Sequence, residues 1–160
     1  YQIDWTSSFT AANLEIVLDR TPPKKQSWGG YAGLSVRFAK DFSERQAIGK
    51  DGPVQFGPGN RFRGEGIAMD YTGIIDGEPN GIAFLDHSSN PRHPTPWYVI
   101  RSAKMSYMNA ALLTHQPLKL SPGQSLTLRY RLIVHPHRWD ANRLLHAHQE
   151  YQQHLTPKTN

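Results

Sequence analysis

A stretch of mixed polar chemistry lies between two apolar runs: FLDHSSNPRHPTPWYV, residues 84–99. Three prolines fix φ there and bias each preceding residue toward extended geometry, which predicts a rigid loop. A rigid loop lowers the entropic cost of holding polar side chains in one arrangement, as a binding or catalytic surface requires. Pro-rich loops also cap β-sandwiches without any further role, and this structural alternative carries equal weight.

The acid and base candidates of this loop are two histidines and a carboxylate. His87 is predicted as the acid/base group with Asp86 as the residue that orients it, and His93 as a second proton-transfer or ligand group. Asp70 would complete an acid/base pair with Asp86 if the fold brought the two carboxylates to a suitable separation.

The substrate-binding candidates offer hydrogen bonds, charge and a flat ring. Asn90 and Arg92 are predicted to bind hydroxyls or a carboxylate, and Trp97 to stack on a sugar ring. Arg63 alternates with polar residues two positions away on either side, which places them on one strand face. That face is either a polar cleft wall or an ordinary solvated surface.

A second histidine pair, His135 and His137 in IVHPHRW, has the spacing of two metal ligands on a strand. Pro136 favours a strand end instead, where both histidines would form local hydrogen bonds in the corner before a helix. No cofactor is therefore predicted, and a divalent metal held by this pair remains the alternative.

The elements that must position these groups are mainly strands. Alternating apolar residues recur in short segments that are separated by turn-forming clusters such as DGEPNG and SPGQ. The sequence predicts an all-β fold, an antiparallel sandwich. The longest strand, residues 125–135, has Ile133 as the only aliphatic residue on its polar face. The period then changes to a helical one after Asp140, a predicted N-cap, so one short C-terminal helix is expected.

Composition restricts the classes of protein that fit. The 160 residues are 38% hydrophobic and 19% charged, which predicts one sandwich domain over residues 1–155 and a flexible tail at 156–160. Cysteine is absent, and no window approaches the roughly 18 apolar residues of a membrane span. The net charge is +5, but only Lys24–Lys25 and Arg61 with Arg63 cluster, so neither a nucleic acid nor a membrane is an expected partner.

Three blocks carry a resemblance to a known family: GGYAGLSVRF (29–38), GIAFLDHSSNPRHPTPWYV (81–99) and SPGQSLTLRYRLIVH (121–135). In this order they resemble the PmoA-like domain of unknown function, which is found mostly in bacterial proteins, many of them exported. The chain departs from the family pattern at Met69–Tyr71 and at His137–Arg138. Family members are longer at the N-terminus, so the chain resembles the C-terminal part of the full domain.

The resemblance implies a galactose-mutarotase-like supersandwich with a concave face and loops at its rim, and it favours export as the location. The label methane oxygenase often attached to the family is not carried over. It belongs to an integral membrane subunit, whereas nothing in this sequence has the length of a span.

Three functions follow as hypotheses. The first is a carbohydrate-active protein that acts on or binds a sugar or modified glycoside through the loop at residues 84–99. The second is a structural or interaction half-domain whose open edge pairs with a missing N-terminal half or with another subunit. The third is a metal oxygenase that uses His135, His137 and a loop histidine.

Overall fold

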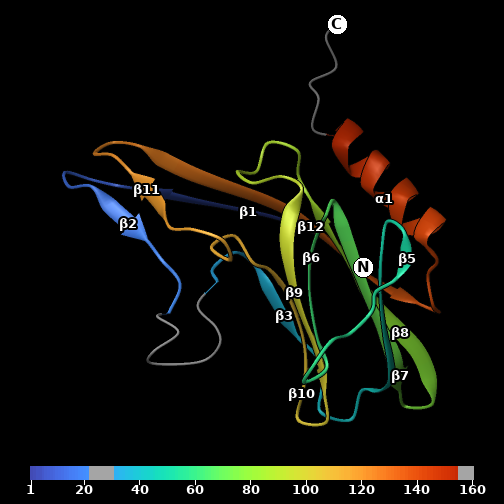
Figure 1. Ribbon diagram of the computed structural model, residues 1–160. Coiled ribbons are helices and arrows are strands. Elements are labelled where there is room, and N and C mark those ends of the chain that lie inside the picture. Colours follow the sequence, from blue (N-terminus) through green and yellow to red (C-terminus); the bar gives the residue numbers. More distant parts are fainter. Residues whose placement is uncertain (22–30, 155–160) are drawn as a thin grey trace, which may run out of the picture.

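The computed structural model describes residues 1–21 and 31–154. The predicted fold class is confirmed: the chain forms antiparallel sheets with one short C-terminal helix (Figure 1). The Lys24–Lys25 pair and the predicted tail at 156–160 lie outside the described residues. Within those ranges, no helix combines the length and apolarity that crossing a bilayer requires.

The larger sheet has six strands, and the alternating pattern of the sequence determines which side chains of each strand face the core. Met69, Tyr71, Phe84 and Tyr130 project from it into the main core. In spatial order the strands are β1 (Gln2–Thr10), β12 (Ser125–Pro136), β8 (Glu78–Asp86), β7 (Ala68–Ile75), β4 (Ser43–Gly49) and β5 (Gly52–Pro53).

The second sheet packs against the first and contributes Trp97, Val99 and Met108 to the same core. The Trp97 ring meets Phe84 edge-on with ring centroids 5.0 Å apart, and Phe84 meets Tyr130 in the same way at 5.2 Å. Its strands, in spatial order, are β3 (Ser35–Arg37), β10 (Met105–Ala110), β9 (Thr95–Ser102) and β6 (Arg61–Gly66).

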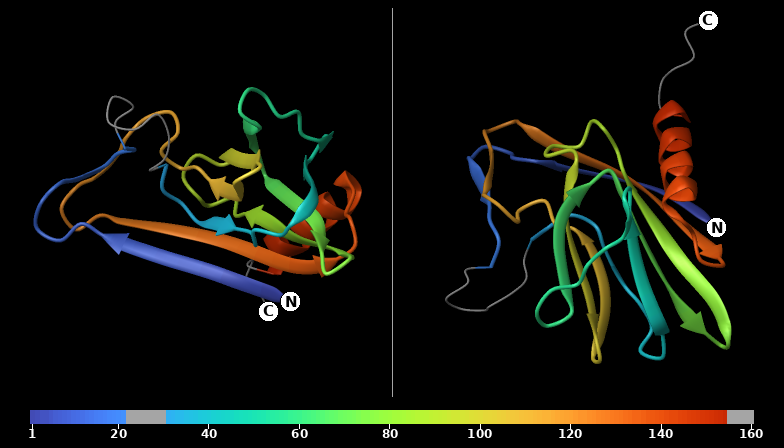
Figure 2. Two further views of the ribbon diagram at one scale, coloured as in Figure 1. Left: turned by 90° about the horizontal axis from the view of Figure 1, so that it is seen from below. Right: turned by 45° about the vertical axis from the view of Figure 1, so that its right-hand side comes forward.

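Helix α1 (Ala141–His154) covers the other face of the six-stranded sheet, where it contacts β7, β8 and β4 (Figure 2). The predicted N-cap is confirmed, because the Arg143 N–H donates to Asp140 Oδ1 at 2.8 Å. Leu144 and Tyr151 pack on this face together with Ile133. Ile133, the one aliphatic residue on the polar face of β12, is therefore covered by the helix.

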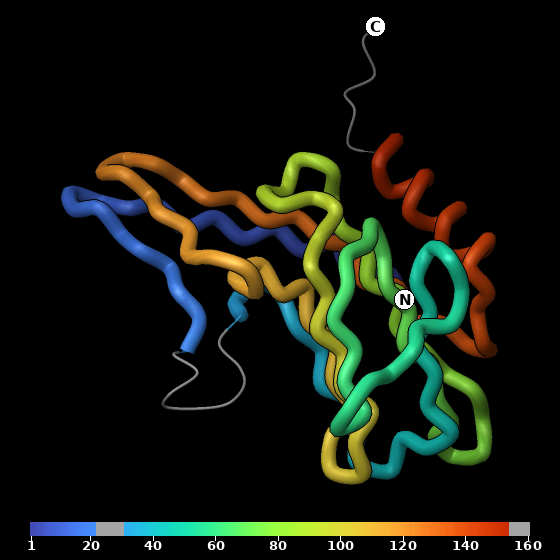
Figure 3. The backbone as a smooth tube through the Cα atoms, viewed as in Figure 1, coloured from blue at the N-terminus to red at the C-terminus, as the bar shows by residue number. Residues whose placement is uncertain are grey.

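An arm projects from the body of the molecule (Figure 3). It consists of the outer parts of β1 and β12 together with a small sheet of β2 (Ile16–Leu18) and β11 (Leu118–Leu120). Of the eight large hydrophobic side chains that are exposed in the described ranges, seven belong to residues 1–17. Within the described ranges, β1 and the segment that follows it into the arm therefore concentrate the exposed apolar surface.

The position of Trp97 in the core yields the first prediction. Replacing Trp97 by Ala should lower the free energy of unfolding by about 3–5 kcal/mol, because a buried aromatic side chain leaves a cavity. Trp5→Ala is the matched control: this side chain is 47% exposed on the edge strand, and its loss should cost less than about 1 kcal/mol. Urea denaturation of both variants measures the difference, and equal losses would contradict the assignment of Trp97 to the core.

Candidate functional site

The central pair of the loop is Asp86 and His93. Asp86 is the last residue of β8, and its side chain is 0% exposed. Its Oδ2 lies 2.7 Å from His93 Nδ1, and its Oδ1 accepts a hydrogen bond of 2.7 Å from the Asn90 amide. The imidazole of His93 is 21% exposed. The carboxylate thus orients His93, which corrects the prediction that it would orient His87.

Burial controls the protonation of this carboxylate. Desolvation raises the pKa of Asp86, and the hydrogen bonds from Asn90 and His93 offset part of the increase. Burial disfavours the charged form of an acid, so a proton is held more readily than on a solvated aspartate. The Asp86 carboxylate is therefore a better proton acceptor than a solvated aspartate.

His87 has a different local partner from the one the sequence predicts. Its Nδ1 accepts a hydrogen bond of 3.1 Å from the Ser89 N–H and lies 2.6 Å from the Ser89 hydroxyl. Its ring meets Tyr151 edge-on at 5.6 Å. Burial lowers the pKa of His87, and the positive charge of Arg129 lowers it further. The imidazole is therefore neutral near pH 7, and because Nδ1 accepts from Ser89, the ring proton lies on Nε2, which can donate a hydrogen bond.

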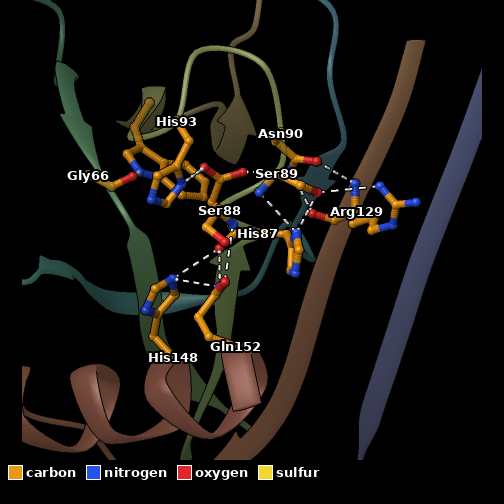
Figure 4. A network of polar contacts seen from close by, with 11 residues as sticks. Gly66, His87, Ser88, Ser89, Asn90, His93, Arg129, His148 and Gln152 are labelled. Atoms are coloured by element: carbon orange, nitrogen blue, oxygen red, sulfur yellow. Dashed lines mark hydrogen bonds and ion pairs between the residues drawn. The ribbon is translucent and has the colours of Figure 1, made fainter. Parts of the chain in front are cut away.

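Helix α1 adds two residues that the sequence analysis did not assign to the site (Figure 4). His148 Nε2 lies 3.0 Å from the Asp86 carbonyl oxygen, and the Gln152 side-chain amide donates to the same oxygen at 3.1 Å. The His148 ring centroid is 6.4 Å from that of His93. His148 follows the buried Leu144 by four residues, and this helical spacing is the sequence signal that could have identified it.

Asn90 holds the loop to the six-stranded sheet. Its side chain is buried, and the amide donates to Asp86 and to the Arg129 carbonyl at 2.6 Å. Its side-chain oxygen accepts a hydrogen bond of 2.7 Å from the Arg129 N–H. The Asn90 amide, which was predicted to bind substrate hydroxyls, instead forms hydrogen bonds within the protein. These bonds fix the distance between the loop and β12.

The predicted substrate contacts of Arg92 and Trp97 do not fit the structure. The Arg92 guanidinium donates to the backbone carbonyls of Leu112, Gln116 and Pro117, which ties the loop to the segment after β10. Trp97 is 1% exposed, and its indole N–H donates to the Gly66 carbonyl at 2.9 Å. A ring without an accessible face cannot stack on a sugar, so Trp97 belongs to the core.

Arg63 does not join the loop residues. It is exposed on β6, with its guanidinium 4.7 Å from the centroid of the Tyr98 ring. Neighbouring residues of a strand point to opposite faces, so Tyr98 faces outward where Trp97 faces the core. Arg63 therefore lies on the outer surface of the four-stranded sheet.

The second Asp–His pair is separate from the first. Asp70 pairs with Ala83 in the register of β7 and β8, so Asp86, three residues further along β8, projects from the opposite face. The predicted acid/base pair of Asp70 and Asp86 does not form. Instead Asp70 Oδ1 lies 2.9 Å from Nε2 of the buried His135, whose ring stacks on Trp139 at 4.0 Å.

His135 and His137 do not form a pair of metal ligands. His135 is buried against Asp70, whereas His137 is exposed after the strand with φ of 63°. Across residues 1–21 and 31–154, no three His, Asp or Glu side chains gather closely enough to hold a metal ion. The geometry of the described residues gives the metal alternative no ligand set.

The buried imidazole of the helix leads to a prediction about pH. Burial lowers the pKa of His148, so the unfolded chain binds the proton more readily and stability is lost as the pH falls below the ordinary value for histidine. The loss cannot exceed about 1.4 kcal/mol per pH unit for one group. His148→Gln, which keeps a donor for the Asp86 carbonyl, should reduce the loss of unfolding free energy between about pH 7.5 and about pH 5.5.

Urea denaturation at the two pH values measures this difference. His146→Gln is the matched control on the same helix, because the His146 side chain is 61% exposed. An unchanged pH dependence in His148→Gln would contradict the role of His148 as a buried neutral imidazole.

Comparison with known families places the chain in an uncharacterised group. A family model described as a family of unknown function (DUF6807) covers residues 1–149 of the chain. No curated protein matches the sequence.

Proposed function

Since the chain belongs to the DUF6807 family, whose function is unknown, we propose from the geometry that it is a carbohydrate-active protein. His93 is its acid/base group, and Asp86 holds that imidazole in place. The observation that carries the proposal is a completely buried carboxylate 2.7 Å from Nδ1 of a partly exposed histidine.

The pair has the arrangement that general acid/base catalysis requires. A carboxylate at Nδ1 places the proton on that nitrogen and leaves the Nε2 lone pair to accept one from a substrate. Within the described ranges, no group forms a hydrogen bond with His93 Nε2, and the ring is 21% exposed. When Nε2 takes up a proton, the carboxylate of Asp86 stabilises the imidazolium.

A sugar suits the exposed polar groups of this loop. Ser88 and Ser89 are exposed, and His87 is a neutral imidazole next to them. The serine hydroxyls can donate and accept hydrogen bonds and His87 Nε2 can donate one, which is what a polyhydroxylated neutral substrate needs. The resemblance to the PmoA-like domain and its galactose-mutarotase-like fold supports the same class of ligand and is part of this proposal.

The test replaces the imidazole with an amide of similar size. His93→Gln should lower kcat/KM for the sugar substrate by roughly 100-fold to 10,000-fold, because proton transfer in the transition state is lost. A thermal-shift screen against sugars, sugar acids and glycosides identifies the ligand, since a ligand that prefers the folded state raises the melting temperature. Turnover of that ligand is then followed by NMR.

His146→Gln, on the exposed side of α1, is the control and should keep full activity. The melting temperature of His93→Gln without ligand separates a loss of chemistry from a loss of fold. Wild-type turnover in His93→Gln, or no stabilisation by any sugar in the panel, would overturn the proposal.

A second candidate function rests on the edge strand β1. Ile3, Trp5 and Phe9 are 46%, 47% and 54% exposed, and their register with β12 places them on the face of the sheet that forms the core elsewhere. Within the described ranges β1 pairs with β12 alone, so its other edge presents unpaired backbone groups. We infer an interaction module in which β1 pairs with β1 of a second copy across a two-fold axis, because one self-complementary strand then satisfies the edge of both chains and brings the two apolar rows side by side.

Sedimentation tests this candidate. The chain should sediment as a dimer, and Trp5→Lys should sediment as a monomer because the charge lies within the apolar row. Ser8→Lys, on the opposite face of the same strand, is the control and should remain dimeric. A wild-type chain that is monomeric at all concentrations would contradict the inference.

A further inference from the structure

The outer face of the four-stranded sheet carries a groove that is distinct from the loop. Two rows of side chains cross the sheet there, because paired residues of neighbouring strands project on the same side. One row consists of Arg37, Tyr107, Ile100 and Arg61, and the next of Ser35, Asn109, Tyr98 and Arg63. The groove encloses a cavity of about 560 Å³, which is within the range of small-molecule sites.

The charged side chains among the described residues that line the groove are all positive. Arg37 and Arg61 lie at the two edges of the sheet, and Lys104 comes from the turn between β9 and β10. Among the described residues that line the groove, none is acidic. Cations gathered in a concave site raise the local concentration of anions and attract an anionic ligand.

The floor of the groove is aromatic and is held in place by its neighbours. Tyr98 contacts Tyr31 edge-on at 5.1 Å, and its hydroxyl accepts a hydrogen bond of 2.9 Å from Arg61 Nε. This bond orients the Arg61 guanidinium before any ligand arrives, which lowers the entropic cost of binding. Tyr107 is only partly buried and supplies ring surface beside the aliphatic Ile100.

We propose that this groove binds an anionic saccharide. Arg37, Arg61 and Lys104 hold its carboxylate or sulfate groups, and the apolar face of a sugar ring packs on Tyr107. Ser35 and Ser102 line the same cavity and provide polar groups for hydroxyls. The site is separate from the acid/base pair, because neither Asp86 nor His93 lines the groove.

The experiment measures binding by isothermal titration calorimetry to three hexasaccharides: oligogalacturonate, a heparin fragment and neutral maltohexaose. Either anionic sugar should bind, with an affinity that falls as salt is added, and maltohexaose should not. A preference between the two anions identifies the carboxylate or the sulfate as the ligand group. Binding of neither anion, or equal binding of maltohexaose, would overturn the proposal.

The variants locate the site. Arg37→Ala and Lys104→Ala should each weaken binding about tenfold, because each removes one charge-assisted contact. Both side chains are exposed, so neither change disturbs the core. Lys119→Ala, an exposed lysine of the arm, is the matched control. Unchanged affinity in Arg37→Ala and Lys104→Ala would overturn the assignment to the groove.

His93→Gln separates this proposal from the proposed function. It should leave the affinity for the anionic hexasaccharide unchanged while it abolishes turnover at the loop. Loss of this affinity in His93→Gln would mean that the anion binds at the loop, which would overturn the groove as its site.

Discussion

The structure around the loop depends on one requirement: a carboxylate with no exposed surface must have its hydrogen bonds satisfied. A buried charge without partners would cost several kcal/mol, and Asp86 meets this requirement through Asn90 and His93. The backbone of the same residue joins further elements. Its N–H donates to the Ile67 carbonyl at 3.0 Å, and its carbonyl meets two side chains of α1, those of His148 and Gln152. The loop, the helix and the six-stranded sheet therefore share one anchoring residue.

Local patterns of the sequence predict the elements, whereas the contacts within the site depend on how the loop turns. Alternation and a change of period are enough to predict the strands, the helix and the Asp140 cap, because each reflects the burial of one face. The path of the loop determines which histidine contacts Asp86. The chain turns where the Asn90 N–H donates to the His87 carbonyl, and Arg92 then takes φ of 66°, so His93 returns to the carboxylate. No periodicity encodes that reversal.

Strand β9 contributes to the core and to the groove because its residues alternate between two environments. Trp97 and Val99 face the core, whereas Tyr98 and Ile100 face the groove. Aromatic residues next to each other in sequence therefore have opposite roles, and composition alone could not separate them. The sequence signal for this face is the alternation of Arg61 and Arg63, a pattern that fits a polar cleft wall as well as a solvated surface. Its partners on β3 and β10 are distant in sequence, and only the register brings them together.

The peptide bond between Asn90 and Pro91 affects the chemical stability of the Asn90 side chain. Asparagine deamidates when the backbone nitrogen of the following residue attacks its side-chain amide and closes a cyclic imide. Proline has no N–H with which to form this ring. Deamidation at this position would place a second carboxylate beside Asp86 and would remove the donor that both Asp86 and the Arg129 carbonyl use. The residue on which the loop geometry rests is thus protected by its neighbour in the chain from this route of deamidation.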